Sequence, residues 1–298
     1  MDDIIRLDSI AQYNSLRGIE TLHPLVSVFD FAEMRLIPEG RATYGFYCVF
    51  LKEAICGDLK YGCNYYDYQE GTLVFIAPGQ VVGIGSKPGK PMPQGRGLIF
   101  HPDIIRGTSL GRNIKNYTFF SYEANEALHL SEKERQVILD CFDNIDHELH
   151  LSVDKHSKAL ISNNIELLLN YCLRFYDRQF ITRSQVNKGI LEKFERLLDD
   201  YFQSGMPRTH GLPTVKYCAE NIHLSANYLG DLIKKDTGKS AQEHIQLKLI
   251  DIAKERIFDR SKSVSEIAYE LGFKHPQHFS RMFRNETGYA PNQYRSMN

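Results

Sequence analysis

A pattern of hydrophobic and polar positions occurs twice near the C-terminal end of the chain. The stretch TVKYCAENIHLSANYLGDLIKKDTG, residues 214–238, matches SVSEIAYELGFKHPQHFSRMFRNETG, residues 263–288, with one inserted residue. The matched positions are Val215 and Val264, Cys218 and Ile267, Ala219 and Ala268, Ile222 and Leu271, Leu224 and Phe273, Leu229 and Phe279, Ile233 and Phe283, Thr237 and Thr287, and Gly238 and Gly288. The sequence therefore predicts two tandem copies of one supersecondary structure.

Each copy has the pattern of a short helix, a tight turn and a second helix. In the second copy Ser263 and Glu266 have the spacing of a capping box, which begins a helix. Gly272 provides a helix stop, and Pro276 suits the first turn of the next helix. The positions predicted to be buried are Ile267, Ala268, Leu271, Phe279, Met282 and Phe283. This is the pattern of a helix-turn-helix motif, whose second helix can lie in a DNA major groove.

The segment between the copies predicts one helix over residues 240–259. Ser240 and Glu243 form another capping-box pair. Apolar residues recur at helical spacing at Ile245, Leu249, Ile252, Ala253 and Ile257. At ~1.5 Å per residue such a helix would be ~30 Å long, and successive major grooves on one face of B-DNA lie ~34 Å apart. One chain could thus place two recognition helices in adjacent grooves without dimerising.

These residues resemble the DNA-binding domain of the AraC/XylS family of bacterial transcription regulators. The run from 263 to 295, which ends in PNQYR, is similar to the family signature almost throughout, and the resemblance covers roughly the last third of the chain. It implies base contacts from the second helix of each copy. In the first copy the matching positions are Asn227, Gly230 and Asp231, which depart from the larger polar or basic residues of many relatives. Because Arg can bond guanine and Gln can bond adenine, we expect the second copy to discriminate sequence more strongly.

The resemblance and the residue chemistry together give two sets of candidates. The candidate base-contacting residues are Asn227, Tyr228, Asp231, Gln277, His278, Ser280 and Arg281, and the candidate phosphate-contacting residues are Lys234, Lys235, Lys239 and Arg284. One alternative is that these charged side chains are only solvated, as an exposed Lys or Arg on a helix often is. Another is that His275 and His278 form a metal pair, but no Cys or carboxylate completes a set of ligands at suitable spacing.

Between residues 25 and 120 the chain favours short β-strands separated by turn residues. The predicted strands are 26–31, 42–51, 54–61, 64–68, 72–77, 97–101 and 117–120. Many short strands predict a small barrel or sandwich. The family resemblance implies a cupin-like β-barrel, and GTLVFIAPGQ, residues 71–80, looks like one strand and corner of it. The predicted fold class is therefore α+β, with a cupin-like β-barrel and a helical segment followed by an all-α domain with two helix-turn-helix motifs joined by a long helix.

The N-terminal segment lacks the ligands of a cupin metal site. Gln80 stands where a ligand His is expected, and His101 is the single histidine between residues 24 and 128. We therefore predict no metal, no cofactor and no enzymatic activity, and the alternative is a cupin-type enzyme fused to a DNA-binding domain. The mouth of the barrel could instead hold a small-molecule effector between aromatic side chains. The candidate wall residues, for which a role in the core is the alternative, are Tyr44, Phe46, Tyr47, Tyr65, Tyr66 and Tyr68.

From Ser131 onward the pattern changes to helices that begin with a capping box at Ser131 and Glu134. These helices either cover the barrel or pair with a second copy of the chain, and the resemblance implies a homodimer. The histidines among them, predicted to be solvated rather than metal-bound, are His147, His150 and His156. The predicted domains are residues 1–128 for the barrel, 129–180 for a helical dimerisation segment, 181–186 for a linker and 187–298 for the DNA-binding domain, which contains an exposed loop at 203–213.

Composition agrees with this organisation. Residues 205–298 contain 14 Lys and Arg against 10 Asp and Glu, a net charge of +4, and the −1 of the whole chain leaves −5 for residues 1–204. The six cysteines show no CxxC spacing, which favours reduced thiols. No signal peptide and no apolar run long enough to span a bilayer are evident. We expect a cytoplasmic transcription regulator that binds double-stranded promoter DNA, contacts RNA polymerase and responds to a small-molecule effector.

Overall fold

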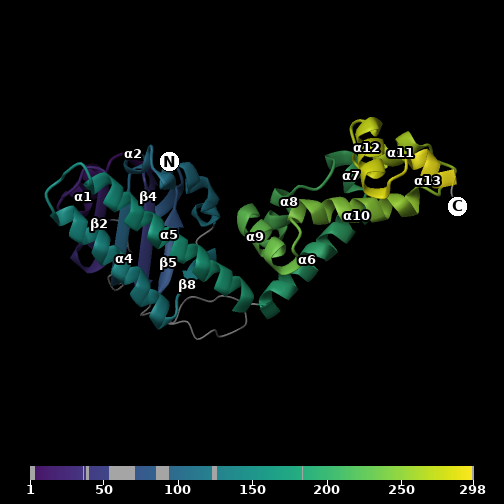
Figure 1. Cartoon of the computed structure of the whole chain (residues 1–298). Helices are drawn as coiled ribbons and strands as arrows, with labels where there is room; N and C mark the ends of the chain where they lie inside the picture. Colours follow the sequence, from purple (N-terminus) through teal and green to yellow (C-terminus); the bar gives the residue numbers. More distant parts are fainter. Residues whose placement is uncertain are drawn as a thin grey trace. The chain divides into compact units, whose positions relative to one another are not determined.

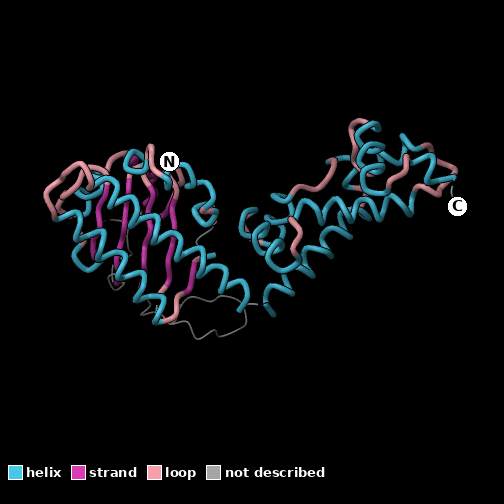
Figure 2. Tube along the Cα trace, viewed as in Figure 1, coloured by secondary structure: helices cyan, strands magenta, loops and turns pink. Residues whose placement is uncertain are grey.

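The computed structural model describes residues 4–35, 37, 40–53, 71–84, 94–122, 126–182 and 184–296, without the side chains of 184–186. The chain divides into two compact units, residues 1–179 and 180–298. Strands and helices make up the N-terminal unit, and the described part of the C-terminal unit is helical (Figures 1 and 2). The predicted α+β class is confirmed.

The described strands of the N-terminal unit form two sheets. The first has the order β1 (Ile4–Leu7), β3 (Gly40–Tyr44) and β6 (Val81–Ile84), with β1 parallel to β3. The second is antiparallel and has the order β2 (Val26–Asp30), β7 (Gln94–Phe100), β4 (Tyr47–Glu53), β5 (Thr72–Ile76) and β8 (Leu128–His129). These strands do not close into a barrel, so the cupin-like barrel is not confirmed.

Two predicted strands differ from the structure. Residues 42–51 form two strands rather than one, because the chain turns at Gly45, where an added Cβ would lie 2.9 Å from the carbonyl oxygen of Asp8. Residues 117–120 are not a strand, since Thr118–Ser121 is a 3₁₀ helix. Both Phe119 and Phe120 are buried, whereas consecutive residues of a strand point to opposite faces. The predicted strands 54–61 and 64–68 lie outside the described residues.

An aromatic core fills the space beside the first sheet. Helix α1 (Ile10–Arg17) begins with a capping box at Ser9 and places the ring of Tyr13 within 5.6–5.8 Å of the rings of Phe29, Tyr44 and Phe46. Tyr13 is 2% exposed. Burial of such large rings stabilises this unit.

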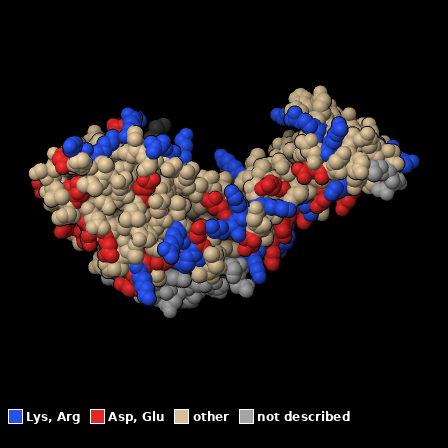
Figure 3. All heavy atoms as spheres, viewed as in Figure 1, with Lys and Arg blue, Asp and Glu red and all other residues tan. Residues whose placement is uncertain are grey.

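Two long helices, α4 (Glu132–His150) and α5 (Ser157–Thr182), cover the five-stranded sheet in Figure 1. The capping box predicted at the start of α4 is confirmed, because the amide of Ser131 donates to Glu134 Oε2 at 2.9 Å and the amide of Glu134 donates to Ser131 Oγ at 3.4 Å. Acidic and basic side chains are mixed over the outer surface of this unit in Figure 3. The shorter helices of the unit are η1 (Phe31–Glu33), α2 (Pro102–Ile105), α3 (Ser109–Asn113) and η2 (Ile114–Asn116).

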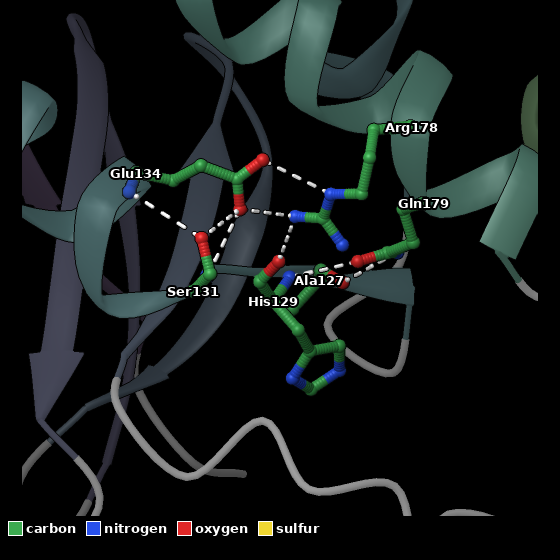
Figure 4. Close-up of polar contacts among 6 residues, drawn as sticks. All are labelled: Ala127, His129, Ser131, Glu134, Arg178 and Gln179. Carbon is green, nitrogen blue, oxygen red and sulfur yellow. Dashed lines mark hydrogen bonds and ion pairs between the residues drawn. The ribbon is translucent and has the colours of Figure 1, made fainter.

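Polar side chains attach the last turns of α5 to the edge strand β8 (Figure 4). Arg178 donates from Nε and Nη2 to the two carboxylate oxygens of Glu134, at 3.0 and 2.6 Å, and from Nη2 to the carbonyl of His129 at 2.7 Å. The amide of Gln179 accepts from the backbone N–H of His129 at 2.8 Å and donates to the carbonyl of Ala127 at 3.2 Å. The end of the N-terminal unit is therefore held by directional bonds as well as by packing.

The C-terminal unit consists of helices arranged along one central helix. They are α6 (Ser184–Gln203), α7 (Met206–His210), α8 (Val215–Ile222), α9 (Ala226–Thr237), α10 (Ala241–Arg256), α11 (Val264–Glu270), α12 (Pro276–Thr287) and α13 (Pro291–Ser296). The pair α8 and α9 lies at one end of α10, and the pair α11 and α12 lies at the other (Figure 1). Of the described helices, none is both long and apolar enough to cross a membrane.

The segment predicted as an exposed loop, 203–213, is exposed at most of its residues, but it is partly helical and packs at two points. It contains α7, whose Pro207 is buried, and Gly211 lies directly against Gly272 at the turn of the second helix-turn-helix copy. An added Cβ on Gly272 would be 2.8 Å from the carbonyl carbon of Gly211. The prediction treated glycine and proline as loop signals, but here they permit a close contact between two segments distant in sequence.

Candidate nucleic-acid interface

The duplicated pattern folds into two modules, module 1 (α8 and α9) and module 2 (α11 and α12). Each helix start has a local hydrogen bond or a proline. In module 1 the hydroxyl of Thr214 accepts from the amide of Tyr217 at 3.1 Å, and that of Ser225 accepts from the amide of Tyr228 at 3.2 Å. In module 2 the predicted capping box at Ser263 is present, and Pro276 occupies the first turn of α12. The boundaries thus follow from residues within each module.

The same hydrogen bonds end the second helix of both modules. The hydroxyl of Thr237 donates to the carbonyl of Ile233 at 2.8 Å, and that of Thr287 donates to the carbonyl of Phe283 at 2.7 Å. The glycines that follow have positive φ, 76° at Gly238 and 81° at Gly288. The sequence repeat is therefore reproduced in detailed local geometry.

Helix α12 buries one face and exposes the opposite one. Phe279 and Phe283 are fully buried in a cluster that also contains α10 and α11 side chains. Of the predicted base-contacting residues in this module, Gln277, His278 and Arg281 are exposed and Ser280 is half-buried. The rings of His275 and His278 lie 5.5 Å apart at the start of the helix. The apolar stripe thus turns the predicted polar residues outward.

Helix α9 has the same division between a buried and an exposed face. Leu229, Leu232 and Ile233 are buried, whereas Asn227 is exposed and Asp231 is half-buried. Tyr228 was predicted to contact bases, but it is 5% exposed and its ring centroid lies 5.2 Å from that of Phe180. Tyr228 therefore takes part in packing in this structure, and its base contact stays a prediction.

The predicted phosphate-contacting residues lie near the C-terminal ends of α9 and α12. Lys234 and Lys235 are in the last turn of α9, Lys239 follows it, and Arg284 is in the last turn of α12; all four are exposed. Lysine and arginine are favoured there by the helix dipole even without DNA. On the face shown in Figure 3, Lys and Arg atoms occur around α12, while Asp and Glu atoms line the lower edge near α6 and α10.

The connecting helix α10 is shorter than predicted. It spans Ala241–Arg256 rather than 240–259, which is ~24 Å at ~1.5 Å per residue. Its N-terminal capping box is confirmed, and its C-terminal end is held by Arg256, whose Nη2 donates to the carbonyl of Phe202 at 3.0 Å. Phe202 of α6 also belongs to the buried cluster of module 2. Helix α6 therefore joins α10 in supporting module 2.

Two helix-capping carboxylates and one buried thiol of this unit have shifted pKa values. Hydrogen bonds from the hydroxyl and amide of Ser240 hold the pKa of Glu243 below its ordinary value. Hydrogen bonds from the amide and hydroxyl of Ser263 lower the pKa of Glu266 in the same way. Burial raises the pKa of the Cys218 thiol, at the base of module 1, to about 11. These shifts arise from helix capping and core packing, away from the exposed faces of α9 and α12.

Three of the six predicted effector-binding residues are described, and they are buried or half-buried. Tyr44 and Phe46 are 3% and 0% exposed and stack on each other in the core. Tyr47 is half-buried and stacks on Phe100 with ring centroids 5.0 Å apart. The other three predicted residues, Tyr65, Tyr66 and Tyr68, lie outside the described residues.

The position predicted to replace a metal ligand has a structural role. The side-chain amide of Gln80 accepts from the amide of Ala77 at 2.8 Å and donates to the carbonyl of Phe120 at 3.1 Å. Within the described ranges, no three His, Cys, Asp or Glu side chains are grouped as metal ligands. The cysteines described there, Cys48, Cys141, Cys172 and Cys218, are buried free thiols.

Comparisons with known proteins find similarity over most of the two modules. Residues 218–297 match the family model described as a helix-turn-helix domain. The uncharacterized HTH-type transcriptional regulator YobQ of Bacillus subtilis is 34% identical over 143 residues, 48% of this chain and 52% of that protein. The uncharacterized transcriptional regulatory protein YesN of the same organism is 32% identical over 110 residues, 36% of this chain and 28% of that protein. The chain thus spans about half or less of the length of these relatives.

A solved structure is also among the proteins to which this chain is similar. It is a transcriptional regulator of Chromobacterium violaceum, described with AraC-type DNA-binding domain-containing proteins, and it is 20% identical to this chain. The match covers 37% of this chain and 91% of that one, with a TM-score of 0.33.

Proposed function

Residues 218–297 form a helix-turn-helix domain of the AraC type, and from this premise we propose that the chain is a sequence-specific DNA-binding transcription regulator. One observation carries the proposal. Two modules with the same buried stripe and the same helix ends turn a polar face outward on their second helices, α9 and α12. A recognition helix needs this arrangement, since its base contacts must stay free while its position is held by the core.

Module 2 supplies most of the direct base contacts. Arg281 is exposed on α12 and has the planar donors that match the O6 and N7 acceptors of guanine. Gln277, one helical turn earlier, bonds adenine. The hydroxyl of Ser280, which lies between them, can donate to a base acceptor or accept from a base donor. His278 borders the same face at the start of the helix. In module 1, Asn227 and Asp231 bond the exposed amino groups of adenine or cytosine.

Phosphate contacts orient both helices without specifying sequence. These contacts come from residues at or just beyond the C-terminal ends of α9 and α12, namely Lys234, Lys235, Lys239 and Arg284. Such contacts release counterions, so binding weakens steeply as the salt concentration rises.

The N-terminal unit is the sensory and assembly part of the regulator. It binds a small-molecule effector in a cupin-like domain, and its helices support a homodimer. The support for dimer formation is that Leu160 and Leu167, seven residues apart on α5, are 47% and 45% exposed on one side of that helix. The bound regulator also contacts RNA polymerase. Thermal stabilisation of the full chain in a small-molecule screen tests the effector, because a ligand of the folded state raises its apparent stability.

The test of DNA recognition uses the full chain and a pool of duplexes with a randomised core. We expect the chain to enrich a defined sequence, with affinity that falls as salt is increased. Arg281→Ala should relax the preference at one base pair and weaken discrimination there by about 1 to 3 kcal/mol. Arg196→Ala is the control, since Arg196 is an exposed arginine on α6 and its loss changes the net charge equally.

Failure to enrich any sequence would refute the proposed function. An unchanged preference in Arg281→Ala, with enrichment by the wild type, would refute only the assignment of that residue.

A further inference from the structure

Gly230 lies in the interior of the recognition helix of module 1, where glycine is unfavourable. Helix α9 extends from Ala226 to Thr237, so Gly230 has helical residues on both sides. A glycine there gains more backbone freedom on unfolding than alanine does, which destabilises the helix. We therefore looked for a contact that would exclude a side chain at Gly230.

The surroundings of Gly230 within the protein provide no such contact. An added Cβ would meet no atom within 4 Å, and the backbone does not have a positive φ. Gly189, inside α6, is equally open, but two other glycines of the chain differ. At Gly97 an added Cβ would be 2.4 Å from the ring of Phe29, and at Gly272 it would be 2.8 Å from Gly211. Glycine is required at those two positions by internal contacts, but at Gly230 it is not.

The position of Gly230 on α9 indicates what does require it. Asn227, three residues earlier, and Lys234, four residues later, are exposed, and residues at these spacings share one face of a helix. In the repeat Gly230 matches Ser280, which lies between Gln277 and Arg281 on α12. Gly230 is thus at the centre of the face that module 1 turns toward its ligand.

We infer that Gly230 is a close-approach position, at which the backbone of α9 packs directly against double-stranded DNA. This inference rests on the proposed function. Because Gly230 has no side chain, the backbone of α9 can lie nearer to the duplex than the backbone of α12 does at Ser280. This closer approach lets Asn227 and the lysines of module 1 contact the duplex. A methyl group at Gly230 holds the whole helix away and weakens these contacts together. Module 1 therefore contributes mainly close packing of its backbone against the duplex, and module 2 contributes most of the base-specific hydrogen bonds.

The experiment compares full-length Gly230→Ala and Gly230→Ser with wild type. The serine variant introduces the residue that module 2 has at this position. Gly189→Ala is the matched control, because Gly189 is also inside a helix, α6, with no atom within 4 Å of an added Cβ, but lies outside both modules. The measurements are the urea midpoint and the affinity for duplexes that wild-type protein enriches from a random-sequence pool.

We expect both alanine variants to raise the urea midpoint, and only the Gly230 variants to bind DNA more weakly. The loss for Gly230→Ala should be about tenfold, comparable to one good base contact. Wild-type affinity in Gly230→Ala would overturn the inference, and so would a lowered urea midpoint, since the position would then not be open. If wild-type protein enriches no sequence, the proposed function itself fails, which is a distinct result.

Discussion

Gln179 offers a test of how the end of the N-terminal unit is held. Its side chain is 1% exposed, and its amide satisfies the backbone N–H of His129 and the carbonyl of Ala127. Gln179→Leu keeps the approximate volume but leaves both buried backbone groups without these partners. Each unsatisfied group costs about 1–3 kcal/mol, so we expect the unit to lose about 2–4 kcal/mol of unfolding free energy. Urea unfolding followed by hydrogen exchange of peptides from β8 reports this unit alone.

Gln80→Leu is the matched control in the same unit. Gln80 also accepts from one backbone amide and donates to one carbonyl, but it is half-buried. Water can replace part of its bonding, so the expected loss is smaller, about 1 kcal/mol. Equal losses for the two variants, or a loss below about 1 kcal/mol for Gln179→Leu, would refute the argument that burial sets the cost.

Three further predictions concern caps, protonation and thiols. Ser263→Ala should cost about 1 kcal/mol in urea unfolding of the C-terminal unit, the usual effect of losing a helix cap. The bonds from Ser263 lower the pKa of Glu266. The stability that ionised Glu266 adds to the folded state is therefore present above its ordinary pKa of 4.5, and it is lost as the pH falls through the folded-state pKa. The difference between wild type and Ser263→Ala should therefore shrink in urea titrations below pH 4.5. Burial raises the pKa of Cys48 and Cys172 well above the ordinary range, so peptide mapping should show alkylation of both in urea but not in the native protein.

Features encoded by neighbouring residues were predictable from the sequence. The capping boxes at Ser131, Ser240 and Ser263 depend on side chains three residues apart, and the structure contains all three. The burial of Phe279 and Phe283 likewise follows from their spacing on one helix. For the same reason the exposed face of α12 was predictable, because it is the face opposite to these rings.

Features that depend on distant contacts were not predictable. The packing of Gly211 against Gly272 joins segments about sixty residues apart, and locally the first of these has only loop signals. The burial of Tyr228 against Phe180 likewise depends on a residue nearly fifty positions earlier. Strand β1 has a partner in β3 through a parallel pairing that no local pattern reveals. The sequence contains one signal for the burial of Tyr228, because this residue directly precedes Leu229 and borders the apolar stripe of α9.

The two modules show which part of a duplicated structure is constrained by folding and which part is not. Thr237 and Thr287 make equivalent bonds to the carbonyls four residues earlier, and the following glycines have nearly the same φ. The exposed faces of the two helices differ, because Gly230 of α9 stands at the position that Ser280 has in α12. Folding explains the shared bonds, since each one satisfies a helix end. It does not explain the difference, because a Cβ at Gly230 would meet nothing within the protein. The divergence of the exposed faces is the result expected if the two modules contact DNA in different ways, which is the inference that Gly230→Ala tests.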